Sequence, residues 1–154
     1  MEKSDLPFLR ELYASTRREE MALSGWPQEQ IEEFLEQQFE AQHSHYMEHF
    51  AGADFDIITT KQKKAPIGRL YLEEREDEFR IIDIALLPEW RGKGVGGRLM
   101  TRILEKARAV GKAVRIHVEQ NNPAMHLYKR LGFEKIDDHG IYHLMEVRPG
   151  GVNQ

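Results

Sequence analysis

The sequence contains no cysteine among its 154 residues, which excludes disulfide bonds, thiolate metal sites and a cysteine acyl-enzyme. A cysteine-free chain is compatible with a reducing compartment, and we expect a cytoplasmic protein. Serine is scarce: the four serines, at positions 4, 15, 24 and 44, all precede the first expected strand. The nucleophile elbow G-x-S-x-G is therefore absent. No apolar run approaches the ~18 residues of a membrane-spanning helix, and the opening residues show no signal-peptide pattern.

The charge balance is slightly acidic, with a formal net charge of −4, 31% charged residues and 40% hydrophobic residues. A chain without a basic excess is poorly suited to nucleic acid or to an anionic membrane surface, so we expect neither partner. The hydrophobic share is sufficient for one core. We therefore expect a single domain over residues 1–148, followed by a loose tail at residues 149–154.

The most informative stretch runs from Ile82 to Leu99 and joins a strand to a helix through a glycine-rich turn. Residues 79–87 are mostly apolar and predict a buried strand, which Pro88 ends because proline has no N–H for the ladder. A helical pattern follows the turn. Such a turn leaves backbone N–H groups unpaired at a helix start, where phosphate oxygens can approach them. The glycines of the turn are at positions 92, 94, 96 and 97.

Several phosphate-binding loops share this composition. A P-loop requires Lys-Ser/Thr after its last glycine, and Gly97 is followed by Arg98. The dinucleotide pattern G-x-G-x-x-G is present as Gly92, Gly94 and Gly97, which leaves a nucleotide-dependent oxidoreductase as an alternative. However, that pattern belongs directly after a strand, and residues 88–91 intervene here. A glycine-rich turn without any ligand is a further alternative.

Hydrophobic periodicity predicts two leading helices, then a three-stranded antiparallel meander that ends in the strand before the glycine turn. After the helix that follows the turn, a further strand, a short helix and a final hairpin are expected. The expected helices cover residues 6–23, 26–50, 99–110 and 124–131, and the expected strands cover residues 55–60, 67–73, 79–87, 113–119, 133–138 and 141–147.

The second predicted helix carries a motif of a different kind. His45 to His49 spells H-x-x-E-H, in which two histidines four residues apart could share a metal ion, as in inverted zinc peptidases. A catalytic zinc site needs a further ligand at a suitable spacing, and the sequence shows none. We therefore expect no metal.

A second informative stretch runs from Asn122 to Phe133. A strand ends near Asn122, a short helix carries Tyr128, and Leu-Gly-Phe closes the unit. Together with the motif Arg91-x-x-Gly94-x-Gly96, this stretch resembles the two signatures of the GNAT superfamily of N-acetyltransferases. The resemblance covers residues 55–147, and the two leading helices agree with the family in kind only.

The resemblance implies an α+β fold in three layers, with a splayed mixed sheet of about six strands and helices on both faces. Residues 1–148 would form a single GNAT-like acetyltransferase domain. One feature departs from the family pattern, because GNAT domains usually begin with a strand before the first helix and this chain begins almost at the helix. The N-terminal edge strand would be absent, or another segment would cover the sheet edge.

The implied function is transfer of an acetyl group from acetyl-CoA to a primary amine by direct attack in a ternary complex. A non-catalytic acyl-CoA-binding or regulatory module on the same fold is the alternative. The acceptor would be a small-molecule amine or a peptide amine, and a homodimer is an open possibility. The residues expected to bind the coenzyme are Leu86, Leu87, Arg91, Gly92, Lys93, Gly94, Val95, Gly96, Gly97, Arg98 and Asn122.

The same resemblance assigns Tyr128 as the general acid that protonates the departing thiolate. A phenol with a pKa of about 10 stays protonated at neutral pH. The general base is less defined, because Asp83, Glu119 and His117 are all candidates and a water molecule could serve instead.

Overall fold

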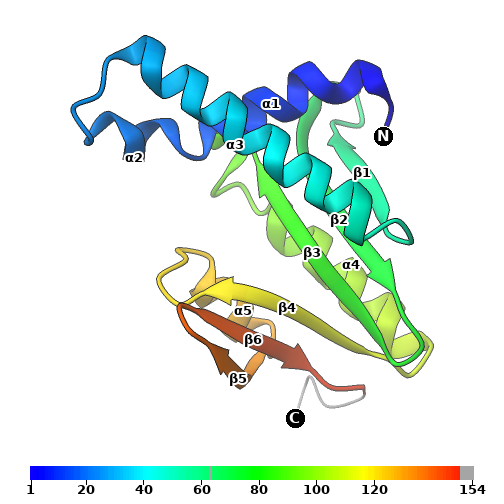
Figure 1. Ribbon diagram of the computed structural model, residues 1–154. Coiled ribbons are helices and arrows are strands. Elements are labelled where there is room, and N and C mark those ends of the chain that lie inside the picture. The colour runs from blue at the N-terminus through cyan, green and yellow to red at the C-terminus, as the bar shows by residue number, and fades with distance from the viewer. Residues whose placement is uncertain (63, 150–154) are drawn as a thin grey trace. The chain divides into compact units, whose positions relative to one another are not determined.

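The computed structural model describes residues 1–62 and 64–149 (Figure 1). These residues form two compact units. The first unit comprises Met1–Leu70 and Ile84–Arg91, and the second comprises Tyr71–Asp83 and the chain from Gly92 onward. Of the tail expected at residues 149–154, positions 150–154 lie outside the described residues. The single domain over residues 1–148 stays a prediction.

Six strands form one mixed sheet in the order β1-β2-β3-β4-β6-β5. β3 and β4 are parallel, whereas β4 with β6 and β6 with β5 are antiparallel. This confirms the predicted six-stranded mixed sheet and the α+β class. Among the described residues no strand precedes the first helix, and β1 is an edge of the sheet. The strands are β1 (Asp54–Thr59), β2 (Pro66–Glu74), β3 (Glu78–Leu86), β4 (Ala113–Glu119), β5 (Glu134–His139) and β6 (Tyr142–Val147).

The single leading helix expected over residues 6–23 is wrong, because the chain forms two helices there. The hydroxyl groups of Ser15 and Thr16 donate to the carbonyl oxygens of Leu12 and Tyr13, both at 2.7 Å, and these local bonds compete with helix continuation. The helices are α1 (Leu6–Ser15), α2 (Arg18–Ala22), α3 (Gln28–His49), α4 (Val95–Ala109) and α5 (Met125–Arg130), with short 3₁₀ turns η1 (Lys3–Asp5) and η2 (Pro88–Trp90).

The first unit is built on the packing of α1 against α3. Leu9 of α1 and Leu35 and Phe39 of α3 are almost completely buried, and the Tyr13 and Phe39 rings meet edge to face at 6.0 Å. His43 continues this stripe with its ring stacked on Phe39 at 5.5 Å. An apolar stripe at helical spacing is typical of a helix that packs in this way.

Gly68 of β2 lies very close to the neighbouring part of β3 within the first unit. A Cβ atom built on Gly68 would lie 2.4 Å from the carbonyl oxygen of Ala85 and 2.8 Å from the Leu86 side chain. Any larger residue must therefore separate the backbones. This glycine has a packing role that its sequence context does not reveal.

The second unit has its core between β4 and α4. Val114, Ile116 and Val118 of β4 are buried, whereas Arg115, His117 and Glu119 between them are more accessible. This alternation is that of a strand with one face against a helix. The buried partners on α4 are Met100, Ile103, Leu104 and Ala107.

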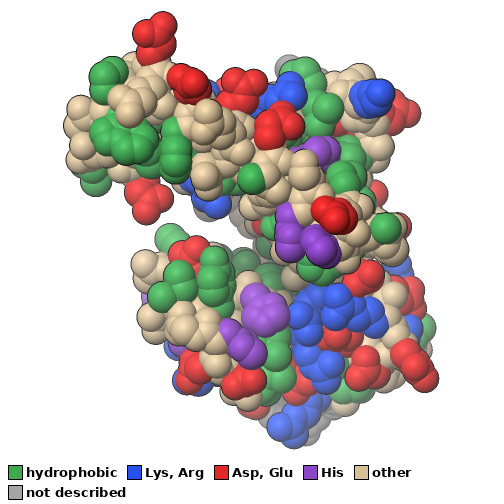
Figure 2. Space-filling model, in the orientation of Figure 1, with side chains coloured by type: hydrophobic (Ala, Val, Ile, Leu, Met, Phe, Trp, Pro, Cys, Tyr) green, Lys and Arg blue, Asp and Glu red, His purple; other side chains and the backbone are tan. Residues whose placement is uncertain are grey.

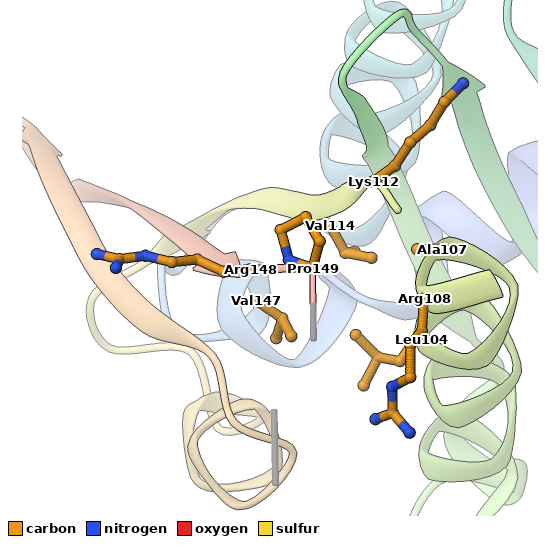
Figure 3. A pocket seen from close by; sticks show the side chains of 8 residues that line it. All are labelled: Leu104, Ala107, Arg108, Lys112, Val114, Val147, Arg148 and Pro149. Carbon is orange, nitrogen blue, oxygen red and sulfur yellow. The ribbon is translucent and has the colours of Figure 1, made fainter. Parts of the chain in front are cut away.

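A small hollow opens beside the end of α4, over the apolar side chains of Leu104, Val114 and Val147 (Figure 3). Its rim is basic, but Lys112 is engaged by the Glu74 carboxylate at 2.7 Å and by the carbonyl oxygen of Arg75 at 2.8 Å. The hollow has room for about one water molecule, so it is too small to hold a cofactor.

On the other face of β4, arginine and glutamate side chains form an ion-pair cluster. Figure 2 shows blue side chains with red neighbours gathered over β3 and β4. Glu78, which is 5% exposed, pairs with Arg75, Arg80 and Arg115, all at 3.2–3.3 Å. Arg115 also pairs with Glu146 of β6 at 2.8 Å. Although burial alone would raise the pKa of Glu78, the arginines lower it below its ordinary value.

Candidate active site

The N-terminus of α4 is an uncapped helix end. Gly94 is the N-cap residue, in the left-handed conformation with φ 81° and ψ 2°, and it has no side chain to bond the helix amides. The first amide with an acceptor in this turn is that of Arg98, which donates to the Gly94 carbonyl at 3.1 Å. The N–H groups of Val95, Gly96 and Gly97 therefore point out of the positive end of the helix dipole.

Gly96 and Gly97 need no glycine-specific conformation, because neither has a positive φ. The protein does not fill the space beside them either. A Cβ on Gly97 would lie 3.6 Å from Leu127 of α5, and one on Gly96 would lie 4.0 Å away, which are ordinary contacts. An alanine at either position would favour the helix by up to about 1 kcal/mol. The glycines therefore keep the backbone open on the side of the amide groups.

Two basic residues expected to bind the coenzyme, Lys93 and Arg98, belong to this part of the second unit. Arg98 is exposed and lies over Gly94, with Nη1 3.2 Å from a Cβ built there. Gly92 has φ 72° and open space around it, and Lys93 is exposed. Arg91 donates from Nε to the carbonyl oxygen of Leu86 at 3.2 Å, so its guanidinium group is partly engaged by the backbone.

Leu86 and Leu87, two of the residues expected to bind the coenzyme, belong to the first unit. The Leu87 N–H donates to the carbonyl oxygen of Ile67 at 2.8 Å, and the Leu87 carbonyl accepts from Trp90 at 2.9 Å. The carbonyl oxygen of Leu86 accepts from Arg91 Nε at 3.2 Å. The role expected for Leu86 and Leu87 in binding the coenzyme stays a prediction.

Asn122 lies at the turn between β4 and α5. Its side-chain oxygen accepts from the Ala124 N–H at 2.8 Å, and its own N–H donates to the carbonyl oxygen of Glu119 at 2.9 Å. These bonds fix the entry of the chain into α5. The side-chain oxygen therefore has a structural role, and the amide nitrogen is the group of Asn122 that suits a ligand.

Tyr128 of α5 is 5% exposed and packs edge to face on Phe133, with ring centroids 5.8 Å apart. Burial raises the pKa of its phenol above the ordinary value of 10, and the negative charge of Asp83 raises the pKa further. Asp83 follows Phe79 and Ile81 at a spacing of two on β3, and so it lies on the same face as these buried side chains. The second unit thus brings together two predicted catalytic residues.

His117 and Glu119, two further candidates for the base, lie on the opposite, accessible face of β4. The Tyr142 hydroxyl donates to Glu119 at 3.5 Å. His117 contacts Arg80 through Nδ1 at 3.4 Å. Burial lowers the pKa of His117, and the positive charge of Arg80 lowers it further. Sequence reasoning identified neither Arg80 nor Tyr142, because their positions depend on strand pairing.

His45 and His49 lie on one side of α3 with ring centroids 4.5 Å apart. Among the described residues, no group of three or more His, Cys, Asp or Glu side chains is arranged to hold a metal ion. The helices formed by residues 1–62 and 64–149 are too short or too polar to cross a membrane.

Comparisons with known proteins bear on the family and the fold. The model of the acetyltransferase (GNAT) family matches residues 7–133. The structure is similar to PaiA N-acetyltransferase from Thermoplasma acidophilum in complex with coenzyme A, with a TM-score of 0.68 and 20% identity over 96% of this chain and 95% of that one. That likeness concerns the fold.

Two curated relatives match shorter segments. The mouse cysteine-rich protein 2-binding protein is 29% identical over 82 residues, which are 53% of this chain and 10% of that protein. The [ribosomal protein bS18]-alanine N-acetyltransferase of Haemophilus influenzae is 31% identical over 62 residues, 40% of this chain and 42% of that protein. The matched segment thus covers less than half the length of each of these two relatives. Because the family model covers most of the sequence, the chain belongs to the GNAT acetyltransferase family.

Proposed function

We propose that this protein transfers an acetyl group from acetyl-CoA to a primary amine by direct attack within a ternary complex. The observation that carries the proposal is the uncapped start of α4. Two consecutive glycines there, Gly96 and Gly97, are required neither by backbone conformation nor by packing. They leave a row of amide donors open to an anionic group.

The residues present fit the coenzyme. The amides of residues 95–97 suit the pyrophosphate, and the exposed Lys93 and Arg98 add positive charge beside them. The Asn122 amide nitrogen suits a polar group of the pantetheine arm. When bound, acetyl-CoA supplies the acetyl group as a thioester.

Tyr128 is suited to proton donation. Its raised pKa means that the phenol keeps its proton throughout the neutral range. The burial that raises the pKa also excludes water, and the adjacent carboxylate of Asp83 opposes loss of the proton. We propose that the Tyr128 hydroxyl gives its proton to the departing thiolate and recovers it from solvent after the product leaves.

The acceptor amine must lose its proton before it attacks. Deprotonation at pH 7 costs a lysine-like amine with a pKa of about 10.4 more than 4 kcal/mol. The same step costs an α-amine with a pKa near 8 only about 1 kcal/mol. The similarity to an alanine N-acetyltransferase supports a peptide amine, and a small-molecule amine is the other class. Location in the cytoplasm and assembly as a homodimer are part of the same proposal.

Two measurements test this function. Acetyl-CoA should raise the melting temperature, and NAD should not. Turnover with a panel of amines, followed as free coenzyme A thiol, should then show catalysis. Stabilisation by acetyl-CoA without turnover of any amine would indicate a non-catalytic acyl-CoA-binding module. Stabilisation by NAD alone would indicate the dinucleotide alternative.

A further inference from the structure

His117 lies where β4 extends beyond its parallel partner. The register between β3 and β4 runs from Glu78↔Ala113 to Ile81↔Ile116, and β4 continues to Glu119. His117 is the first residue after this ladder. Its side chain is on the accessible face, whereas Tyr128 and Asp83 belong to the buried face. His117 is thus the first side chain of β4 beyond the pairing with β3, and it lies on the accessible face.

The contact with Arg80 determines which nitrogen of His117 carries the proton. A guanidinium group can only donate, so the Nδ1 atom of His117, 3.4 Å from Arg80 Nη1, must accept. A neutral imidazole that accepts at Nδ1 carries its hydrogen on Nε2. Burial and the charge of Arg80 both lower the pKa of His117, so this neutral form dominates at neutral pH.

The surroundings of His117 hold this arrangement in place. Arg80 is itself fixed by Glu78 at 3.3 Å, and the His139 ring meets the His117 ring edge to face at 5.4 Å. Figure 2 shows purple imidazoles beside the blue arginine patch of the second unit. In this tautomer His117 presents an N–H donor and has its accepting nitrogen engaged. A donor is poorly suited to remove a proton from the amine.

The charges nearby indicate which oxygen this donor binds. On the same face, Arg115 forms an ion pair with Glu146, and Arg80 forms one with Glu78. Toward the end of β4 lie two carboxylates, Glu119 and Asp137. Asp137 of β5 pairs with Leu144 of β6, and Leu144 pairs with His117 of β4. Asp137 therefore lies on the same face as His117, two strands away. Two carboxylates favour a cationic amine and disfavour a ligand that brings a further carboxylate.

We propose that His117 is a specificity-determining residue whose Nε2–H donates a hydrogen bond to a neutral carbonyl oxygen of the acceptor. The acceptor class is then the N-terminal α-amine of a peptide, in which an amide carbonyl lies next to the amine. Free amino acids carry a carboxylate instead, and alkylamines and polyamines carry no such oxygen. This inference rests on the proposed acetyl transfer and names its substrate class.

The experiment compares two substitutions of His117 on three acceptors. His117→Gln keeps an N–H donor at the reach of Nε2 but cannot accept a proton, whereas His117→Leu removes both properties. The acceptors are alanine amide, free alanine and propylamine, assayed with acetyl-CoA as kcat/KM. His143→Gln is the matched control, because His143 lies on the same hairpin and pairs with Val118 on the other face.

The parent should prefer alanine amide over free alanine and propylamine. His117→Leu should lower kcat/KM for alanine amide about three- to tenfold, the effect of one neutral hydrogen bond, and leave propylamine unchanged. His117→Gln should retain most of the activity on alanine amide, and His143→Gln should behave as the parent.

Two results would overturn the inference. A loss of 100-fold or more in His117→Gln on every acceptor would show that His117 is the general base. Equal effects of His117→Leu on alanine amide and propylamine would show that no carbonyl is bound. Absence of turnover in the parent with all three acceptors, or of stabilisation by acetyl-CoA, would instead count against the proposed function.

Discussion

Replacing Gly97 with alanine should make the protein more stable and at the same time weaken its binding of acetyl-CoA. The new Cβ would lie 3.6 Å from Leu127, which is an ordinary contact, so nothing in the protein opposes it. Alanine favours the helix by up to about 1 kcal/mol, which corresponds to roughly 2–4 °C in melting temperature for a chain of this length.

The ligand-induced shift should change in the opposite direction. At a concentration of 100 times Kd, acetyl-CoA should stabilise the parent by about 2.7 kcal/mol, or roughly 5–10 °C. A methyl group beside the amides keeps phosphate oxygens away. If Kd rises 100-fold, the stabilisation at the same concentration falls to about 0.4 kcal/mol. Melting curves with and without acetyl-CoA measure both effects on one sample.

Three further variants complete the test. Gly96→Ala should behave like Gly97→Ala, because its Cβ would also meet only Leu127, at 4.0 Å. Glu105→Ala, about two turns further along α4 on an exposed site, is the control and should keep the full shift with acetyl-CoA. An undiminished shift in the double variant Gly96→Ala/Gly97→Ala would refute the assignment of the phosphate site to this helix end.

Three other predictions concern catalysis, packing and pH. Tyr128→Phe should have a free energy of unfolding within about 1 kcal/mol of the parent. Its kcat should fall at least ~100-fold at an unchanged KM for acetyl-CoA. If steady-state kinetics show that the variant retains more than a tenth of kcat, Tyr128 is not the acid. Gly68→Ala should destabilise the protein by about 1–3 kcal/mol in urea unfolding, because its Cβ meets the Ala85 carbonyl at 2.4 Å, and an unchanged midpoint would contradict that packing. Burial lowers the pKa of His43, so the unfolded chain binds the proton first and stability should fall as the pH drops below 6.5. His43→Gln should reduce the difference in melting temperature between pH 7.5 and pH 5, whereas His45→Gln, at an exposed position, is the control. Equal behaviour of the two variants would count against a partly buried, neutral His43 in the folded protein.

Much of the fold could be predicted because its signals are local. The strand at Ala113–Glu119 has the bounds that its alternation predicts, and the glycine turn and the short helix with Tyr128 lie where their motifs place them. The break between α1 and α2 was missed, because the apolar spacing of residues 6–23 continues across it. It depends instead on side-chain bonds of Ser15 and Thr16 to the backbone.

The candidate site was less predictable, because its details depend on pairing between distant segments. The face of β4 that carries His117 and Glu119 follows from alternation, but the neighbours Arg80 and Tyr142 follow from register, which a single sequence does not determine. For the same reason His117 appeared as a candidate base. Only the contact of its Nδ1 atom with Arg80 indicates the role of a donor.

The most direct test of the account is acetyl transfer itself. The purified protein would be incubated with isotopically labelled acetyl-CoA and alanine amide, and the product identified by mass spectrometry beside a parallel reaction with the double variant Gly96→Ala/Gly97→Ala. The account predicts N-acetylated alanine amide carrying the label, formed catalytically by the parent and strongly reduced in the variant at low acetyl-CoA. No labelled amide with this or any other amine, or equal product from both proteins, would contradict it.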